Sequence, residues 1–153
     1  MTKHSSSAPR LVEVSGAEAL WLLEGARIGR LVFTLHGLPA VRPAGHVLEH
    51  GTLVVRAAVP LVALRIPGGG PAVLSYHADE VDPGSGRGWT VTAHGPAEPL
   101  TEPHAEAHYR RVLPGWAHGP HDTLLRLRPQ STAGYRLGRL LAPVPDPHPG
   151  ATP

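Results

Sequence analysis

The chain has no cysteine, and its single lysine, Lys3, stands close to the N-terminus. The lack of cysteine excludes thiol nucleophiles, Cys-ligated zinc, iron–sulfur clusters and disulfides, and it fits a reducing compartment. The lack of a lysine further along the chain removes the central residue of a Schiff-base site or a P-loop. Arginine therefore carries the positive charge of the chain.

The sequence also has no long apolar run and no run of basic residues. The 14 basic and 12 acidic residues give a net charge of +2, and they are scattered along the chain. This pattern argues against nucleic acid and membrane partners, and the polar start of the chain has no apolar signal-peptide core. We expect a cytoplasmic protein that acts on a small-molecule substrate.

Glycine and proline are abundant, at 18 residues each among 153. They make long helices unfavourable, and the Val-, Leu- and Thr-rich segments between them favour short strands. The length predicts one domain, which we assign to residues 11–141. We expect a disordered lead at 1–10 and a Pro-rich disordered tail at 142–153.

Three segments have helical signals. Ser15 and Glu18 have the spacing of a capping box, Gly25 can end that helix, and its apolar face is predicted from Ala17, Leu20, Trp21 and Leu23. Residues 60–66 are a candidate short helix. Thr101 can cap a further helix that runs to about Val112.

The remaining segments are predicted strands. His36 and Gly37 form a tight hairpin turn. Pro39 and Pro43 indicate that the return strand has an edge, a bulge, or a place where a ligand instead of a neighbouring strand meets the backbone. The predicted strands are 28–35, 38–47, 52–57, 72–81, 89–98 and 123–128, with 134–139 as a further candidate. Because the strands follow one another instead of alternating with helices, we predict an α+β antiparallel barrel with two or three short helices.

Several strings, taken in order, resemble the pyridoxamine 5′-phosphate oxidase-like family of FMN-binding split β-barrel proteins, over about residues 13–138. The matching strings are 28–33 (IGRLVF), 38–43 (LPAVRP), 54–56 (VVR), 88–95 (GWTVTAHG), 116–122 (WAHGPHD) and 125–129 (LRLRP). The resemblance implies a six-stranded antiparallel split barrel and a homodimer with two flavin or deazaflavin sites between the subunits.

The resemblance also implies cofactor-binding positions. In such relatives the second strand faces the flavin ring, the end of the third strand lies near the ribityl phosphate, and a polar residue early in the fifth strand approaches the cofactor. The positions that correspond here are Arg42, Pro43 and Ala44, then Val55, Arg56 and Ala57, and then Thr90. Trp116 is a further candidate, because an indole can cover a planar ligand, although packing in the core or at a subunit interface also explains such a residue.

The chain differs from the family at the position where relatives bind the phosphate of the cofactor. Relatives commonly have a Ser-Lys pair after the third strand, where this chain has Leu61 and Val62. An apolar pair cannot neutralise a phosphate, so we expect Arg56 and Arg65 to compensate. The chain also lacks the C-terminal extension that the true oxidases use for their substrate, and oxidation of pyridoxamine 5′-phosphate itself is therefore not expected.

The histidines have two interpretations. His104 and His108 lie four residues apart on one helix, but no third ligand accompanies them, and we predict no metal site. His46, His77 and His94 fall in predicted strands, where they are either hydrogen-bonded structural residues or axial ligands of a haem, which some relatives bind.

The sequence therefore favours an FMN-dependent oxidoreductase, in which the cofactor carries the redox chemistry and no catalytic side chain is evident. A deazaflavin is an alternative cofactor. A second hypothesis is a non-enzymatic protein that binds flavin, haem or another flat ligand, and a third is an interaction scaffold with an empty cleft.

Overall fold

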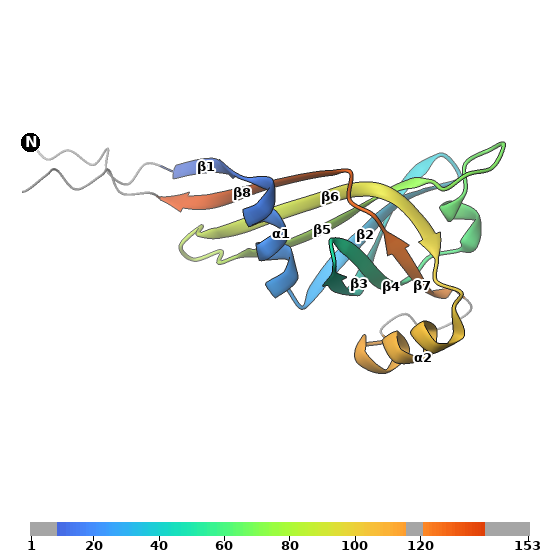
Figure 1. Cartoon of the computed structure of the whole chain (residues 1–153). Coiled ribbons are helices and arrows are strands. Elements are labelled where there is room, and N and C mark those ends of the chain that lie inside the picture. Colours follow the sequence, from blue (N-terminus) through green and yellow to red (C-terminus); the bar gives the residue numbers. More distant parts are fainter. Residues whose placement is uncertain (1–8, 116–120, 140–153) are drawn as a thin grey trace, which may run out of the picture.

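The computed structural model describes residues 9–115 and 121–139, which form mostly strands with a few short helices (Figure 1). The elements are β1 (Pro9–Val14), α1 (Gly16–Gly25), β2 (Ile28–Leu35), β3 (Leu38–Glu49), β4 (Thr52–Ala58), the 3₁₀ helix η2 (Leu61–Leu64), β5 (Val73–Val81), β6 (Gly88–Pro99), α2 (Pro103–Val112), β7 (Asp122–Leu127) and β8 (Ser131–Arg139).

Six of the strands close into an antiparallel barrel. The sheet runs in the order β1-β8-β6-β5-β2-β3-β4-β7, and an additional pairing of β7 with β6 closes the ring. The predicted α+β six-stranded split barrel is therefore confirmed. Figure 1 shows β5, β6 and β8 extending away from the barrel as a long arm, with β3, β4 and β7 at the opposite end.

The long strand β6 belongs to both parts of the molecule. Its first half pairs with β8 as far as His94, and its last residues, from Ala97, pair with β7. At the change of partner, a Cβ placed on Gly95 would lie 1.8 Å from the carbonyl oxygen of Arg128. The segment between β7 and β8 thus crosses β6 at a point where only glycine fits.

The hairpins follow the predicted turn chemistry. His36 and Gly37 both have positive φ angles of 53° and 77°, as a two-residue type I′ turn requires. Pro39 and Pro43 lie in β3 before its pairing with β4 begins at Ala44, so that part of the strand is hydrogen-bonded on the β2 side alone. The predicted edge is confirmed, and it explains how an otherwise internal strand tolerates prolines.

Helix α1 confirms one half of the predicted capping box. The Ser15 hydroxyl accepts the backbone N–H of Glu18 at 3.1 Å, but the Glu18 carboxylate accepts from Arg136 Nε at 2.7 Å instead of turning back to the cap. The predicted apolar face was wrong at Ala17, which is exposed, and at Trp21, which is 67% exposed. The helix buries Ala19, Leu22 and Leu23 instead.

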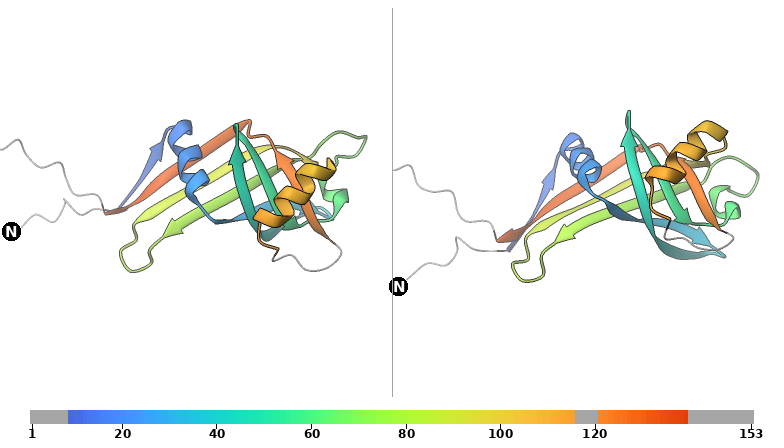
Figure 2. Two further views of the ribbon diagram at one scale, coloured as in Figure 1. Left: turned by 60° about the horizontal axis from the view of Figure 1, so that its bottom comes forward. Right: turned by 90° about the horizontal axis from the view of Figure 1, so that it is seen from below.

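Helix α2 begins differently from the prediction. Glu102, and not Thr101, is the N-cap, and its carboxylate accepts the backbone N–H groups of His104 and Ala105 at 3.0 and 2.7 Å. A carboxylate is favoured at this end because it both satisfies the free N–H groups and lies at the positive end of the helix dipole. Figure 2 shows α2 lying across the outside of the barrel near β7.

Strand β1 was not predicted. It pairs along its whole length with β8 and begins at Pro9, so the first strand starts within the expected N-terminal lead of residues 1–10. The rest of that lead and the whole of the expected tail at 142–153 lie outside the described residues. No helix of the described ranges is long and apolar enough to cross a membrane.

A buried hydrogen-bonded chain joins α1 to the barrel. His46 Nε2 lies 2.9 Å from the carbonyl oxygen of Leu23, and Nδ1 lies 2.5 Å from the Tyr76 hydroxyl. Because a carbonyl oxygen only accepts, Nε2 carries the hydrogen and Nδ1 accepts from Tyr76. Both ring nitrogens are thus bonded within the protein, as expected of a structural histidine.

We predict that Gly95→Ala destabilises the fold by about 3 kcal/mol, because the new methyl group meets backbone atoms that cannot turn aside. The free energy of unfolding in urea measures this effect. Gly84→Ala in an exposed loop is the matched control and should change it by less than about 0.5 kcal/mol. Equal values for the two variants would contradict the close crossing at β6.

We predict that the stability falls in mild acid because of His46. Burial lowers its pKa below the ordinary 6.5, an effect that the hydrogen bond to Leu23 only partly opposes. Below pH 6.5 the unfolded chain therefore takes up a proton that the folded chain refuses, and the free energy of unfolding falls by up to about 1.4 kcal/mol per pH unit until the lowered pKa is reached. Urea unfolding between pH 7.5 and 5 measures the slope, which should flatten in His46→Gln. An unchanged slope in that variant would contradict this assignment.

Candidate functional site

The inside of the barrel is filled with side chains. Leu31, Tyr76 and Leu125 have no accessible surface, and a methyl group on Gly29 would lie 2.4 Å from the ring of Tyr76. Interiors packed in this way do not admit a flat ligand of flavin size. A ligand site must therefore lie on the outer face of the sheet or at an end of the barrel.

The outer face has two unequal halves. Over β4 and β7 it is covered by α2 and its flanking residues, where Val54, Leu100, Leu113 and Leu124 form a second apolar cluster. Helix α1 packs on the opposite face of the sheet, since its Ala19 meets Gly134 beside the core residue Val91. Neither helix covers the outer face of β2, β5 and β6.

That uncovered half carries a row of polar side chains. The strand register places Ser75, His77 and Asp79 of β5 directly opposite His94, Thr92 and Thr90 of β6. We call these six residues the polar row. All six are half-buried in the single chain, although no described element packs on them.

The polar row is hydrogen-bonded along its length. Ser75 Oγ lies 2.7 Å from His94 Nδ1, and Thr92 Oγ1 lies 2.9 Å from His77 Nδ1. His77 Nε2 lies 2.8 Å from Asp79 Oδ2 and 3.4 Å from Thr90 Oγ1. Arg30 of β2 adds a positive charge, with Nη1 3.7 Å from Asp79 Oδ2. The row therefore presents donors, acceptors and a carboxylate in fixed positions.

Arg56 is engaged inside the protein. Its Nε and Nη2 donate to the two carboxylate oxygens of Asp122 at 3.0 and 2.8 Å, and Nη1 donates to the carbonyl oxygens of Arg110 and Leu113 at 3.1 and 2.9 Å. The hydrogen bonds from Arg56 hold the pKa of Asp122 below its usual range. Arg56 thus clamps α2 and β7 to β4, and its role at a phosphate stays a prediction.

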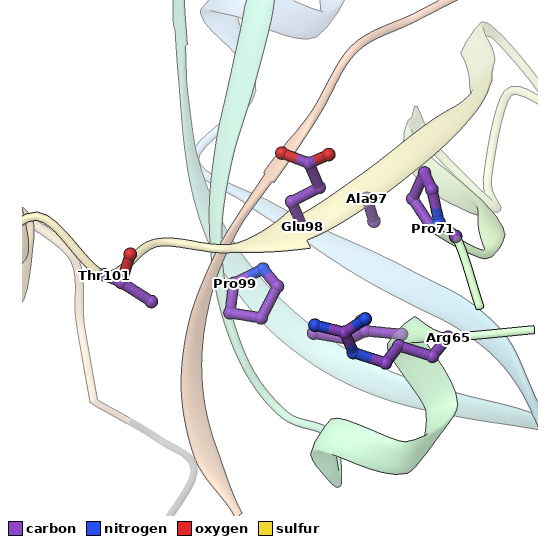
Figure 3. Close-up of a pocket in the computed structure, with 8 residues that line it drawn as sticks. Arg65, Pro71, Ala97, Glu98, Pro99 and Thr101 are labelled. Atoms are coloured by element: carbon purple, nitrogen blue, oxygen red, sulfur yellow. The ribbon is translucent and has the colours of Figure 1, made fainter.

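Arg65 lies at a different place, in the wall of a cavity of about 420 Å³ (Figure 3). The cavity lies between η2, the following glycine-rich loop and the end of β6. Figure 3 shows Arg65 and Pro99 on one side of the β6 ribbon, with the Glu98 carboxylate pointing away on the other. The Arg65 guanidinium is exposed and has no hydrogen bond or ion pair with residues 9–115 or 121–139. It can therefore receive an anion.

The other expected residues are spread over both faces of the sheet. Arg42 is half-buried at the rim of the inner face, 5.7 Å from the centre of the Phe33 ring. Pro43 lies opposite Arg30 on the outer face, and Thr90 is in the polar row. Ala44, Val55 and Ala57 are buried in the core, so they present only backbone atoms to a ligand. Trp116 lies outside the described residues.

Sequence reasoning missed the polar row as a unit. It considered His77 and His94 separately, as structural residues or haem ligands. The signal that could have found the row is the alternation of the two strands, which puts residues 75, 77 and 79 on one face and 90, 92 and 94 on the facing one. Only the register, however, shows which residue meets which.

The fold defines a split-barrel protein, and the uncovered sheet face is its candidate site. A sequence model of pyridoxamine 5′-phosphate oxidase matches residues 15–139. The chain belongs to the pyridoxamine 5′-phosphate oxidase family.

Individual proteins share the sequence or the fold of this chain. The chain is 34% identical over 134 residues to the uncharacterised protein Rv0080 of Mycobacterium tuberculosis. The aligned residues make up 86% of this chain and 88% of the relative. An FAD-binding protein of Mesorhizobium loti has a similar fold, with a TM-score of 0.67 and 19% identity over 86% of this chain and all of the other. The FAD-binding protein of Mycobacterium smegmatis has a TM-score of 0.59 and 22% identity, over 83% and 98% of the two chains.

The residues present have the chemistry that a flavin needs. A flavin combines a flat ring, whose edge carries donors and acceptors, with an anionic end. The polar row offers hydroxyls and imidazoles to such an edge, and exposed apolar side chains beside it, Val41 and Val73, suit the ring faces. Leu61 and Val62 are 60% and 70% exposed and offer nothing to an anion, whereas Arg65 does.

We predict that Arg56→Lys lowers the free energy of unfolding by about 2 kcal/mol, because a lysine loses the two-pronged pairing with Asp122 and the bonds to two carbonyl groups. Urea unfolding at neutral pH measures the loss. The matched control is Arg136→Lys, whose ion pair with Glu18 is far more exposed and should cost only a fraction of that amount. An unchanged free energy of unfolding in Arg56→Lys would show that the contacts of Arg56 do not hold α2 in place.

Proposed function

We propose that this protein is a flavin-dependent oxidoreductase that works as a homodimer, with the cofactor held between the uncovered outer faces of two copies. FMN is the cofactor we propose, acting on a small-molecule substrate. The absence of cysteine fits a reducing compartment, and we propose the cytoplasm as the place of action.

The observation that carries the proposal is the half-buried polar row on a sheet face that no described element covers. Exposed apolar residues flank it, namely Ile28, Val41 and Val73. An apolar rim around convergent polar groups is typical of a surface that binds a ligand or a partner. A second copy would bury this rim and complete a site for a flat ring.

Under this proposal each part of the chain has a defined task. The bound flavin supplies the two-electron redox chemistry. The hydroxyl of Thr90 and the imidazole of His94 orient the ring through its edge. Pro43 and Val41 lie against it and exclude water, and Arg65 holds the anionic end by charge. The organic substrate then needs only to reach the exposed part of the ring.

The proposal predicts that the purified protein binds FMN and that Arg65→Ala weakens the binding at least tenfold, or about 1.4 kcal/mol, because the anionic end loses its cation. Quenching of flavin fluorescence measures the affinity. Arg111→Ala on the exposed side of α2 is the matched control and should leave the affinity unchanged.

Separate titrations with FMN, FAD and a deazaflavin identify the cofactor, and sedimentation tests the dimer. A monomer that rejects all three molecules would contradict the proposal.

A second candidate function is a binding protein without turnover. The observation that favours it is the exposed apolar pair Leu61 and Val62, which stands where relatives commonly place a phosphate-binding Ser-Lys pair. Bleaching of the bound flavin by a reduced nicotinamide separates the two functions. An oxidoreductase accepts the electrons, and a storage or carrier protein keeps the flavin oxidised.

A further inference from the structure

Three residues of the polar row are connected as hydroxyl, imidazole and carboxylate. Thr92 Oγ1 is 2.9 Å from His77 Nδ1, and His77 Nε2 is 2.8 Å from Asp79 Oδ2. The ring is therefore held at both nitrogens, with the carboxylate on one side and the hydroxyl on the other. In such an arrangement the carboxylate fixes the tautomer and the imidazole exchanges protons through the hydroxyl.

The protonation states follow from these contacts. A carboxylate only accepts, so Nε2 keeps its hydrogen in both charge states of His77. The exchangeable proton is then the one at Nδ1. When His77 is charged, Nδ1–H donates to Thr92 Oγ1, and the Thr92 hydroxyl hydrogen is directed to an outside acceptor. When His77 is neutral, Nδ1 accepts from Thr92.

Few other charged groups surround His77. Asp79 lies on its own strand β5, and Arg30 of β2 approaches Asp79 at 3.7 Å. The neighbouring strand β6 contributes the hydroxyls of Thr90 and Thr92 and, one pair further along, the imidazole of His94, which is bonded to Ser75. The side chains of His77 and Asp79 are 26% and 37% exposed, so the couple is shielded but still reachable from the uncovered face.

A nucleophilic role for Thr92 does not fit. Acyl transfer needs free N–H groups aimed at a developing oxyanion. Thr92 lies in the interior of β6, paired with β5 on one side and β8 on the other, so the backbone donors around it serve the sheet. The arrangement can pass on a proton, but the backbone that the structure describes around Thr92 offers no free N–H group to a tetrahedral intermediate.

We propose that Asp79, His77 and Thr92 form a proton relay that opens on the outer face of the sheet and serves a ligand bound there. The inference rests on the proposed function for the identity of that ligand. Reduction of an unsaturated substrate adds a hydride, supplied through the flavin by a reduced nicotinamide, and one proton. Thr92 gives its hydroxyl proton to the substrate atom that gains the electrons, Nδ1–H of His77 replaces that proton, and His77 becomes neutral while Asp79 stays ionised.

The first test uses the free protein and needs no flavin. In ¹⁵N-histidine-labelled protein, the nitrogen shifts of His77 should show hydrogen on Nε2 in the neutral ring. Asp79→Asn should abolish this preference, because an amide can donate to Nε2 as well as accept from it. A neutral ring with hydrogen on Nδ1, or an unchanged tautomer preference in Asp79→Asn, would overturn the relay.

The second test uses the FMN-loaded protein. The midpoint potential of the bound flavin, plotted against pH from 5 to 9, should show a break that depends on His77. His77→Gln and the isosteric Thr92→Val should remove the break, with the affinity for FMN changed less than threefold. The exposed His108→Gln is the control and should retain it. A break that persists in His77→Gln would overturn the inference while leaving flavin binding intact.

If the wild-type protein binds no flavin, the proposed function is wrong. The nitrogen shifts of His77 would still show whether the hydrogen bonds of the relay exist. Covalent labelling of Thr92 by a fluorophosphonate would also overturn the relay, because it would show a nucleophile instead.

Discussion

Strand β6 divides its pairing between two partner strands, and this division shapes the whole sheet. One half of the strand closes the barrel through β7, and the other half continues into an arm with β8. Because the chain crosses back over β6 at Gly95, the sheet can turn its inner face to a single core and still leave the outer face of β2, β5 and β6 open. The polar row lies on that open face, so the fold leaves these side chains accessible.

The two charged arrangements on the outer face have different consequences. Arg56 and Asp122 meet under α2, where the pairing is satisfied within the chain and serves stability. His77 and Asp79 meet where no helix covers them, so their hydrogen bonds remain within reach of a ligand. Both pairs consist of a basic residue and a carboxylate. They differ because α2 covers the pair of Arg56 and Asp122 and leaves the pair of His77 and Asp79 open. Arg65 has no partner among the described residues, so it is a better candidate than Arg56 for binding a phosphate.

Much of the fold could be predicted because its signals are local. The turn at His36 and Gly37, the cap at Ser15 and the alternation along β6 each depend on a few neighbouring residues. Strand β1 was missed because it becomes a strand only through pairing with β8, at the far end of the chain. Trp21 was misplaced because a short helix offers several apolar stripes, and the packing chooses between them. For the site, residue type and resemblance indicated Thr90 and Arg65, whereas the contact of His77 with Thr92 required the strand register.

Under the proposed function, a flavin ring lies on the polar row and is covered by a second copy of the chain. A crystal structure of the FMN-loaded protein would show whether it does. We expect the edge of the ring within hydrogen-bonding distance of the polar row, its anionic end near Arg65, and the partner subunit on its other side. A monomer with FMN seated only in the cavity beside Arg65, and with an empty sheet face, would contradict the account.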